Sequence, residues 1–163
     1  MKRLLLVVCV FALLFTLAGC SGSGETESIT DSYETETPQI SETEKTDMIA
    51  KINVAISDYT FTATLEDNEA AHELLEMIKE KPLTLSLSDY SGFEKVGSLG
   101  RSLTRSDRHT TTKSGDIVLY NGNNIVVFYG SNSWSYTRLG RIDSLENWEK
   151  ALGSGDVTIT LSI

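Results

Sequence analysis

Residues 116–129 read DIVLYNGNNIVVFY and decide the fold more than any other stretch of the chain. Two short apolar segments, 116–120 and 125–129, stand on either side of Asn121-Gly122. An Asn-Gly pair favours the type I′ turn that joins two antiparallel strands, because both residues tolerate a positive φ. We therefore expect a β-hairpin. Both segments are apolar almost without interruption, which indicates strands buried on both faces.

Five further segments around this hairpin have the character of strands. Alternation of apolar and polar residues predicts a strand that is buried on one face. Residues 52–56 and 59–65 alternate on either side of Ser57-Asp58 and predict another hairpin. The remaining segments are residues 83–87, 136–142 and 157–163. The last one alternates to the final residue, so we expect it to lie between two neighbouring strands.

Two segments have the period of an α-helix. Residues 66–80 carry apolar side chains on one stripe, with Asp67 or Asn68 as the N-cap and Pro82 beyond the end. Residues 144–152 predict a shorter helix capped by Ser144, and the residues expected to point inward are Leu145, Trp148 and Leu152.

The stretch from 93 to 115 contains several glycines and few apolar residues, which predicts a long loop with at most a short strand near Val96. Four basic residues gather in it: Arg101, Arg105, Arg108 and Lys113. Such a patch in an acidic protein suits a carboxylate or a phosphate, although an exposed polar loop has the same composition.

Seven strands and two short helices in residues 48–163 predict one mainly β domain, a small closed β-barrel. Closure of the sheet leaves no strand edge exposed to aggregation.

The N-terminus resembles the signal peptide of a bacterial lipoprotein. Lys2 and Arg3 precede an apolar run, and Leu17-Ala18-Gly19-Cys20 resembles a lipobox. The run is shorter than a membrane-spanning helix requires, which argues against the alternative of an uncleaved inserted helix. The resemblance implies that residues 1–19 are removed and that Cys20 carries a diacylglycerol. We therefore expect attachment to the extracytoplasmic side of a bacterial cell membrane.

Residues 20–47 are rich in Ser, Thr and Glu and have few apolar groups, which predicts a disordered acidic tether. A glycosylated stalk has the same composition. Removal of Lys2 and Arg3 leaves 12 basic against 23 acidic residues, a net charge of −11. A chain this acidic repels nucleic acid, so we expect no nucleic-acid partner.

Six segments in order carry a further resemblance: residues 61–68 (FTATLEDN), 85–90 (LSLSDY), 94–97 (EKVG), 115–120 (GDIVLY), 129–140 (YGSNSWSYTRLG) and 153–158 (GSGDVT). Over residues 49–163 the chain resembles the bacterial cyclophilin-like fold family. The resemblance implies a cyclophilin-like β-barrel smaller than a true cyclophilin.

True cyclophilins isomerise Xaa-Pro bonds with an arginine beside an apolar pocket, and Arg138 with Trp134 and Tyr136 resembles that pairing. Their two-residue spacing places these three residues on one face of a strand, and that face lines either a cleft or the barrel exterior. The candidate ligand-binding residues are Trp134, Tyr136 and Arg138, with Phe93 and Phe128 as walls and Arg101 from the basic loop.

Other chemistries lack their motifs. The sequence has no Gly-x-Ser-x-Gly elbow, phosphate-binding loop or dinucleotide glycine fingerprint. His72 and His109 are the only histidines and suit solvated positions, so we expect neither a metal site nor a cofactor. The prediction is a lipid-anchored domain that binds a peptide or small ligand. The alternatives are a peptidyl-prolyl isomerase and a structural module of the envelope.

Overall fold

The computed structural model describes residues 50–163 of the chain. The predicted signal peptide, the lipidation at Cys20 and the tether at 20–47 lie outside these residues. Within the described part, no helix has the length and apolar character needed to cross a membrane.

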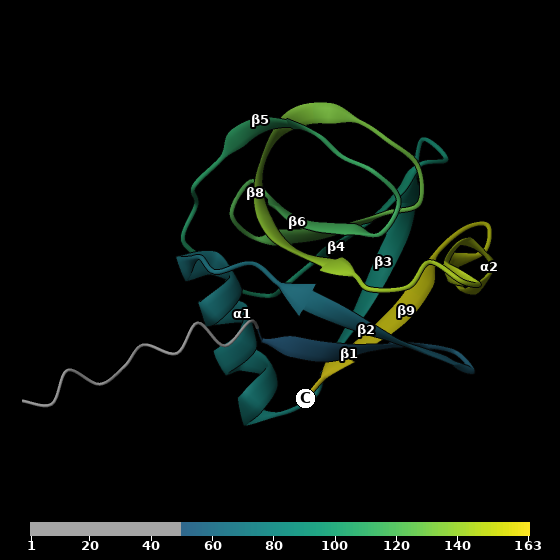
Figure 1. Cartoon of the computed structure of the whole chain (residues 1–163), viewed down its shortest axis with the longest axis horizontal. Helices are drawn as coiled ribbons and strands as arrows, with labels where there is room; N and C mark the ends of the chain where they lie inside the picture. Colours follow the sequence, from purple (N-terminus) through teal and green to yellow (C-terminus); the bar gives the residue numbers. More distant parts are fainter. Residues whose placement is uncertain (1–49) are drawn as a thin grey trace, which may run out of the picture. The chain divides into compact units, whose positions relative to one another are not determined.

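Residues 50–163 form nine strands and two helices. They are β1 (Lys51–Ile56), β2 (Tyr59–Leu65), α1 (Glu69–Glu80), β3 (Leu83–Tyr90), β4 (Glu94–Ser98), β5 (Arg108–Thr111), β6 (Asp116–Tyr120), β7 (Asn124–Phe128), β8 (Ser133–Ile142), α2 (Trp148–Leu152) and β9 (Val157–Ser162). Eight strands make a closed antiparallel ring in the order β2-β1-β9-β3-β4-β7-β6-β8, because β8 pairs with β2 as well as with β6. β5 pairs with the first part of β8 outside this ring (Figure 1). The predicted closed barrel is confirmed, with two strands more than expected.

β6 and β7 form the predicted central hairpin. Asn121 and Gly122 have φ angles of 51° and 79°, which a type I′ turn requires. One face of the hairpin belongs to the main core through Ile117, Leu119, Ile125 and Val127. The other face belongs to a second, smaller cluster through Val118, Val126 and Phe128. The hairpin is therefore a wall between two apolar cores, as its continuous hydrophobicity predicted.

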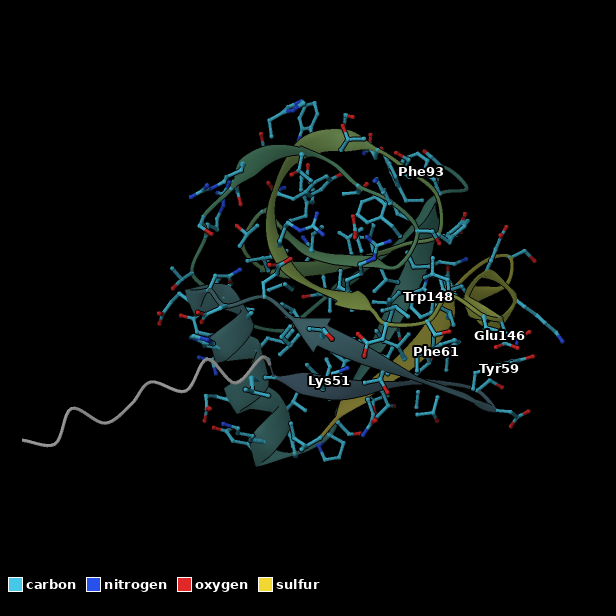
Figure 2. All side chains as sticks on the ribbon, in the orientation of Figure 1. Lys51, Tyr59, Phe61, Phe93, Glu146 and Trp148 are labelled. Carbon is cyan, nitrogen blue, oxygen red and sulfur yellow. The ribbon has the colours of Figure 1, made fainter. Side chains whose placement is uncertain are left out.

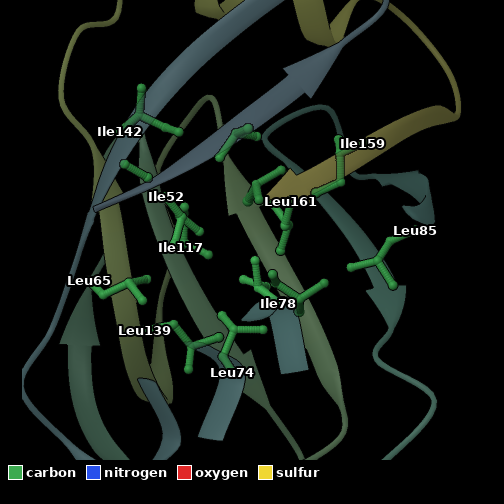
Figure 3. Close-up of a cluster of buried hydrophobic side chains, with 14 of the residues drawn as sticks. Ile52, Leu65, Leu74, Ile78, Leu85, Ile117, Leu139, Ile142, Ile159 and Leu161 are labelled. Atoms are coloured by element: carbon green, nitrogen blue, oxygen red, sulfur yellow. The ribbon is translucent and has the colours of Figure 1, made fainter. Parts of the chain in front are cut away.

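The main core fills the barrel, and α1 packs against it (Figure 3). The helix buries Ala70, Ala71, Leu74 and Ile78, and it contacts β8 and β9. It begins at Glu69 and not at Glu66, because Asn68 is the N-cap and its side chain accepts a hydrogen bond from the Ala71 amide at 3.0 Å.

The stretch from 93 to 115 contains two strands and a loop at 99–107. The short strand expected near Val96 is β4, whereas β5 was not expected and corrects the prediction. β4 is a full member of the ring between β3 and β7, and β5 lies beside β8. The sequence pattern indicates β4 only weakly, because two consecutive charged residues, Glu94 and Lys95, are both buried in it. Gly97 is required in this strand, since a Cβ there would lie 2.5 Å from the Ser86 carbonyl oxygen.

The second helix also begins later than predicted. α2 starts at Trp148, and Ser144 does not cap it, because a turn at 146–147 comes first and Asn147 occupies the N-cap position. Leu145 is 42% exposed and does not point inward as expected, whereas Trp148 and Leu152 are buried. The Trp148 indole donates to the Phe128 carbonyl at 2.8 Å and ties α2 to the end of β7.

The described part is complete as a folding unit. β9 lies between β1 and β3, which confirms the prediction for the C-terminal strand. All buried hydrophobic side chains of this part lie between Ile52 and Leu161 and pack against each other in the two clusters. The ring closes and buries its core with residues 50–163 alone, so residues 48–163 can be produced as a domain.

Candidate functional site

The candidate site lies on the face of β4, β7 and β6 that is turned away from the main core. Strand register places Glu94 opposite Phe128, and Val126 between Val96 and Val118. Residues that pair in register point to the same side of a sheet. This face is covered by the second apolar cluster, to which the first half of β8 contributes Tyr136.

A pocket of about 450 Å³ opens on this face. Its lining comes from five parts of the chain and consists of Tyr90, Glu94, Val96, Tyr120, Asn132, Trp134 and Tyr136. Two of these aromatic residues, Tyr90 and Trp134, are each 58% exposed and form the rim. A concave, mostly apolar site with a few polar groups is the usual form of a small-ligand site.

Glu94 is the chemically unusual residue of the pocket. It is only 6% exposed. Its Oε2 atom is the one buried side-chain polar atom of the described residues that has no hydrogen-bond partner. Burial raises the pKa of this carboxyl to about 7, so both its protonated and its ionised forms are present at neutral pH. A buried polar group without a partner is costly and marks a place where a ligand can supply one.

The inner walls of the pocket are fixed by their own contacts. The Tyr136 hydroxyl accepts a hydrogen bond from the Asn132 amide at 3.0 Å. The Tyr136 ring packs edge-on against Phe128 and Tyr120, with centroids 5.7 and 6.1 Å apart. Burial raises the pKa of Tyr136, which therefore stays a neutral phenol. This side of the pocket is formed in advance of any ligand.

Lys95 does not neutralise Glu94, although the two residues are neighbours. Its side chain is fully buried on the opposite face of β4, where Nζ binds Asp89 at 2.7 Å. Nζ also donates to the carbonyls of Gly153 and Gly155, at 3.0 and 2.6 Å. Asp89 also accepts a hydrogen bond from the Tyr129 hydroxyl. The hydrogen bond from Lys95, and after it the one from Tyr129, hold the pKa of Asp89 below its usual value.

The predicted site residues divide into those that line the pocket and those that do not. Trp134 and Tyr136 line it. Phe93 packs against the second cluster and lies edge-on to Tyr90, with centroids 6.2 Å apart. Phe128 is fully buried beneath the pocket. The sequence analysis did not identify Glu94 as a site residue. The only sequence signal for it is its spacing of two from Val96, and the segment is too short for this spacing to predict a buried face.

Arg138 stands apart from the pocket lining. Its guanidinium binds Glu66 and Asp116, each at 3.1 Å, and its carbonyl accepts from the Asn68 amide at 2.8 Å. Desolvation lowers the pKa of Arg138, but the hydrogen bonds and charges of Glu66 and Asp116 together outweigh it, so the pKa is raised above its usual value. The residue joins β8 to β6 and to the segment before α1.

The basic residues of the 93–115 stretch lie outside the pocket lining. Arg101 is exposed and does not line the pocket, and Arg105 binds Asp107. The loop is held by Leu103, which is buried, and by Thr104, whose amide and hydroxyl both donate to Glu73 at 2.7 Å. Among the described residues, no three metal-ligating side chains come together.

A second, more open groove lies elsewhere on the barrel, along β2 and the turn before α2. Its volume is about 600 Å³, and its lining is more polar. Figure 2 labels Lys51, Tyr59 and Glu146 along this groove, away from Phe93 beside the aromatic pocket. Its central charges satisfy each other, because Lys51 Nζ binds Asp143 at 2.8 Å. None of the described residues of the groove has a buried side-chain polar atom without a hydrogen-bond partner, in contrast to Glu94 in the aromatic pocket.

Comparison with known proteins supports the fold. Residues 54–162 match a family model that is described as the cyclophilin-like family. A hypothetical protein from Archaeoglobus fulgidus, whose structure was determined in solution, is similar with a TM-score of 0.50 and 11% sequence identity. The match covers 69% of this chain and 92% of that one. No curated protein matches the sequence. At this identity the archaeal structure bears on the fold alone.

Proposed function

The chain belongs to the cyclophilin-like family, and from this premise we propose that it is a lipid-anchored extracytoplasmic protein that binds a small ligand or a peptide side chain. Its binding site is the aromatic pocket around Glu94. The observation that carries the proposal is the Glu94 carboxyl, which is 6% exposed and has an oxygen without a partner.

The surroundings of Glu94 support a binding site over a packing defect. A structural carboxyl in a core is normally paired, as Asp116 is with Arg138 and the Lys113 amide. Glu94 instead lines a pocket, and the exposed side chains of Tyr90 and Trp134 form the rim of this pocket. Large aromatic side chains that stay exposed at the edge of a concave site are typical of recognition surfaces.

Binding is favoured over prolyl isomerisation because of the position of Arg138. Isomerisation on the cyclophilin pattern needs an arginine that donates to the proline nitrogen beside the pocket. None of the seven lining residues is an arginine. The guanidinium of Arg138 is occupied by Glu66 and Asp116. A fold shared with isomerases does not by itself carry their activity.

The anchor follows from the sequence. Two acyl chains on Cys20 hold a protein on a membrane durably, whereas one chain gives only reversible binding. An acidic tether at 20–47 separates the lipid from the barrel. The pocket would then meet ligands outside the cytoplasm.

Chemical-shift mapping on residues 48–163 tests the site. A set of uncharged, cationic and anionic fragments of phenyl-ring size should include members that shift the amide signals of Tyr90, Tyr120 and Trp134. Trp134→Ala should weaken this binding. Tyr59→Ala, an aromatic truncation in the second groove, is the matched control and should not. Shifts that gather around Lys51 and Asp143, or no shifts at all, would contradict the proposal.

A further inference from the structure

Four aromatic residues stand around one carboxyl group in the pocket. Tyr90 comes from β3, Tyr120 from β6, and Trp134 and Tyr136 from β8, while Glu94 rises from β4 between them. The faces of aromatic rings carry negative potential and attract cations within about 6 Å of the ring centre. The rings and the carboxyl therefore favour the same kind of ligand, one with a positive charge.

The protein supplies no cation of its own to this carboxyl. Among residues 50–163, Glu94 takes part in no ion pair, and Lys95 points to the opposite face of β4. Arg138 is bound to two other carboxylates. Arg108 lies opposite Tyr136 in the register of β5 and β8, but it is exposed and does not line the pocket. A positive partner for Glu94 has to come from a bound molecule.

We infer that the ligand of this pocket is an organic cation, an apolar body that ends in a protonated amine or a guanidinium. The inference rests on the proposed function of the pocket as a binding site. The N–H of the cation donates to the Glu94 carboxyl, in which Oε2 has no partner from the protein. Its apolar part lies against Val96 and the aromatic walls. An anion of the same size would place like charges together inside a partly dry site whenever Glu94 is ionised, so it binds more weakly than a cation.

Binding is coupled to the ionisation of Glu94. Burial raises the pKa of its carboxyl to about 7, and a bound cation stabilises the ionised form. The other titratable groups that line the pocket are the phenols of Tyr90, Tyr120 and Tyr136, and burial raises the pKa of Tyr136. Lys95 and Asp89 pair on the far side of β4. Affinity for a cation should therefore rise as the pH increases from 6 to 8.

Three probes with one phenyl ring each separate charge from shape. They are phenethylammonium, phenethyl alcohol and phenylacetate, which are cationic, neutral and anionic at pH 7.5. Calorimetry and chemical-shift titration on residues 48–163 should give affinities in the order cation, neutral, anion. We expect the cation to bind about tenfold more tightly than the alcohol, as for a hydrogen bond to a charged partner.

Glu94→Gln should remove this preference and the pH dependence, so that the cation and the alcohol bind alike. Glu76→Gln, on the exposed side of α1, is the matched control and should change neither. Thermal melts establish that both variants fold, and the pH profile of the parent tests the coupling without any variant. Equal affinity of parent for the cation and the alcohol overturns this inference and leaves the proposed function intact. Failure of all three probes and of the wider fragment set to shift the pocket overturns both.

Discussion

Glu94 and Lys95 are consecutive residues whose side chains lie on opposite faces of β4, and only the charge of Lys95 is paired within the protein. Lys95 is fully buried and has three oxygen partners, namely Asp89 and two carbonyls. Glu94 is almost as buried and has an oxygen without a partner. The alternation of a strand separates them by the width of the sheet. One charge is therefore fixed within the structure, and the other is left for a ligand.

Glu94→Gln should change how stability depends on pH. The folded-state pKa of Glu94 is raised from 4.5 to about 7, so the folded protein holds a proton that the unfolded chain releases. The parent should lose stability as the pH rises from about 4.5 to 7, by roughly 3 kcal/mol from this group. Chemical denaturation of parent and variant at pH 5 and pH 8 measures the effect. A constant stability difference between the two pH values would contradict the raised pKa.

Lys95→Met should destabilise the domain by roughly 3 kcal/mol, because it leaves Asp89 and two carbonyls without their donor. Lys79→Met is the matched control. Lys79 binds Glu76 at the same 2.7 Å, but its side chain is 52% exposed, and its loss should cost under about 0.5 kcal/mol. Urea denaturation measures both. Equal losses of unfolding free energy in the two variants would show that burial does not determine how much the Lys95–Asp89 pair stabilises the domain.

Phe128→Ala should cost roughly 3 to 5 kcal/mol, the usual range for a large buried aromatic residue. Phe128 is fully buried at the centre of the second cluster. Tyr90→Ala removes an aromatic ring that is 58% exposed and should have a small effect on the same denaturation midpoint. A parent-like midpoint for Phe128→Ala would mean that the second cluster contributes little to folding.

The sequence predicted much of the fold and only part of the site. The Asn121-Gly122 hairpin, the helix with its Asn68 cap and the final strand could be read locally, because turn chemistry, capping and periodicity act between near neighbours. β4 could be predicted only as a short strand near Val96, because burial of Glu94 and Lys95 depends on partners distant in the chain, such as Gly153 and Gly155 for Lys95.

The site shows the same division. Trp134 and Tyr136 were predicted from alternation along one strand. The partners of Arg138 were not, since Glu66 and Asp116 lie 72 and 22 residues away in the chain. Glu94 was not predicted as a site residue, because the short strand expected near Val96 gave no sign that its carboxyl would be buried. Only the folded barrel brings the four aromatic residues around this carboxyl.

Cys20→Ser should release the full chain from membranes and leave the barrel folded. A lipobox cysteine is the attachment point for the acyl chains, and the barrel closes with residues 50–163 alone. Membrane fractionation and metabolic labelling with a radioactive fatty acid measure attachment. A mutant that stays in the membrane fraction would show that another part of the chain holds it there.

Residues 48–163 should accelerate prolyl isomerisation weakly or not at all. The barrier of about 18 to 20 kcal/mol falls only if a donor is held against the proline nitrogen, and Arg138 is held by Glu66 and Asp116 instead. A protease-free assay on a proline peptide compares the parent with Arg138→Ala. Strong acceleration that disappears in the variant would establish isomerase activity in place of simple binding.

The central claim is that the pocket around Glu94 is the ligand site. The most direct measurement is the set of intermolecular nuclear Overhauser effects between phenethylammonium and isotope-labelled residues 48–163. We expect contacts from the phenyl ring to Trp134 and Tyr136, and from the methylene next to the ammonium group to the Glu94 side chain. Contacts confined to the second groove, around Lys51 and Asp143, would contradict the claim. Saturable binding without any contact to Trp134, Tyr136 or Glu94 would also contradict it.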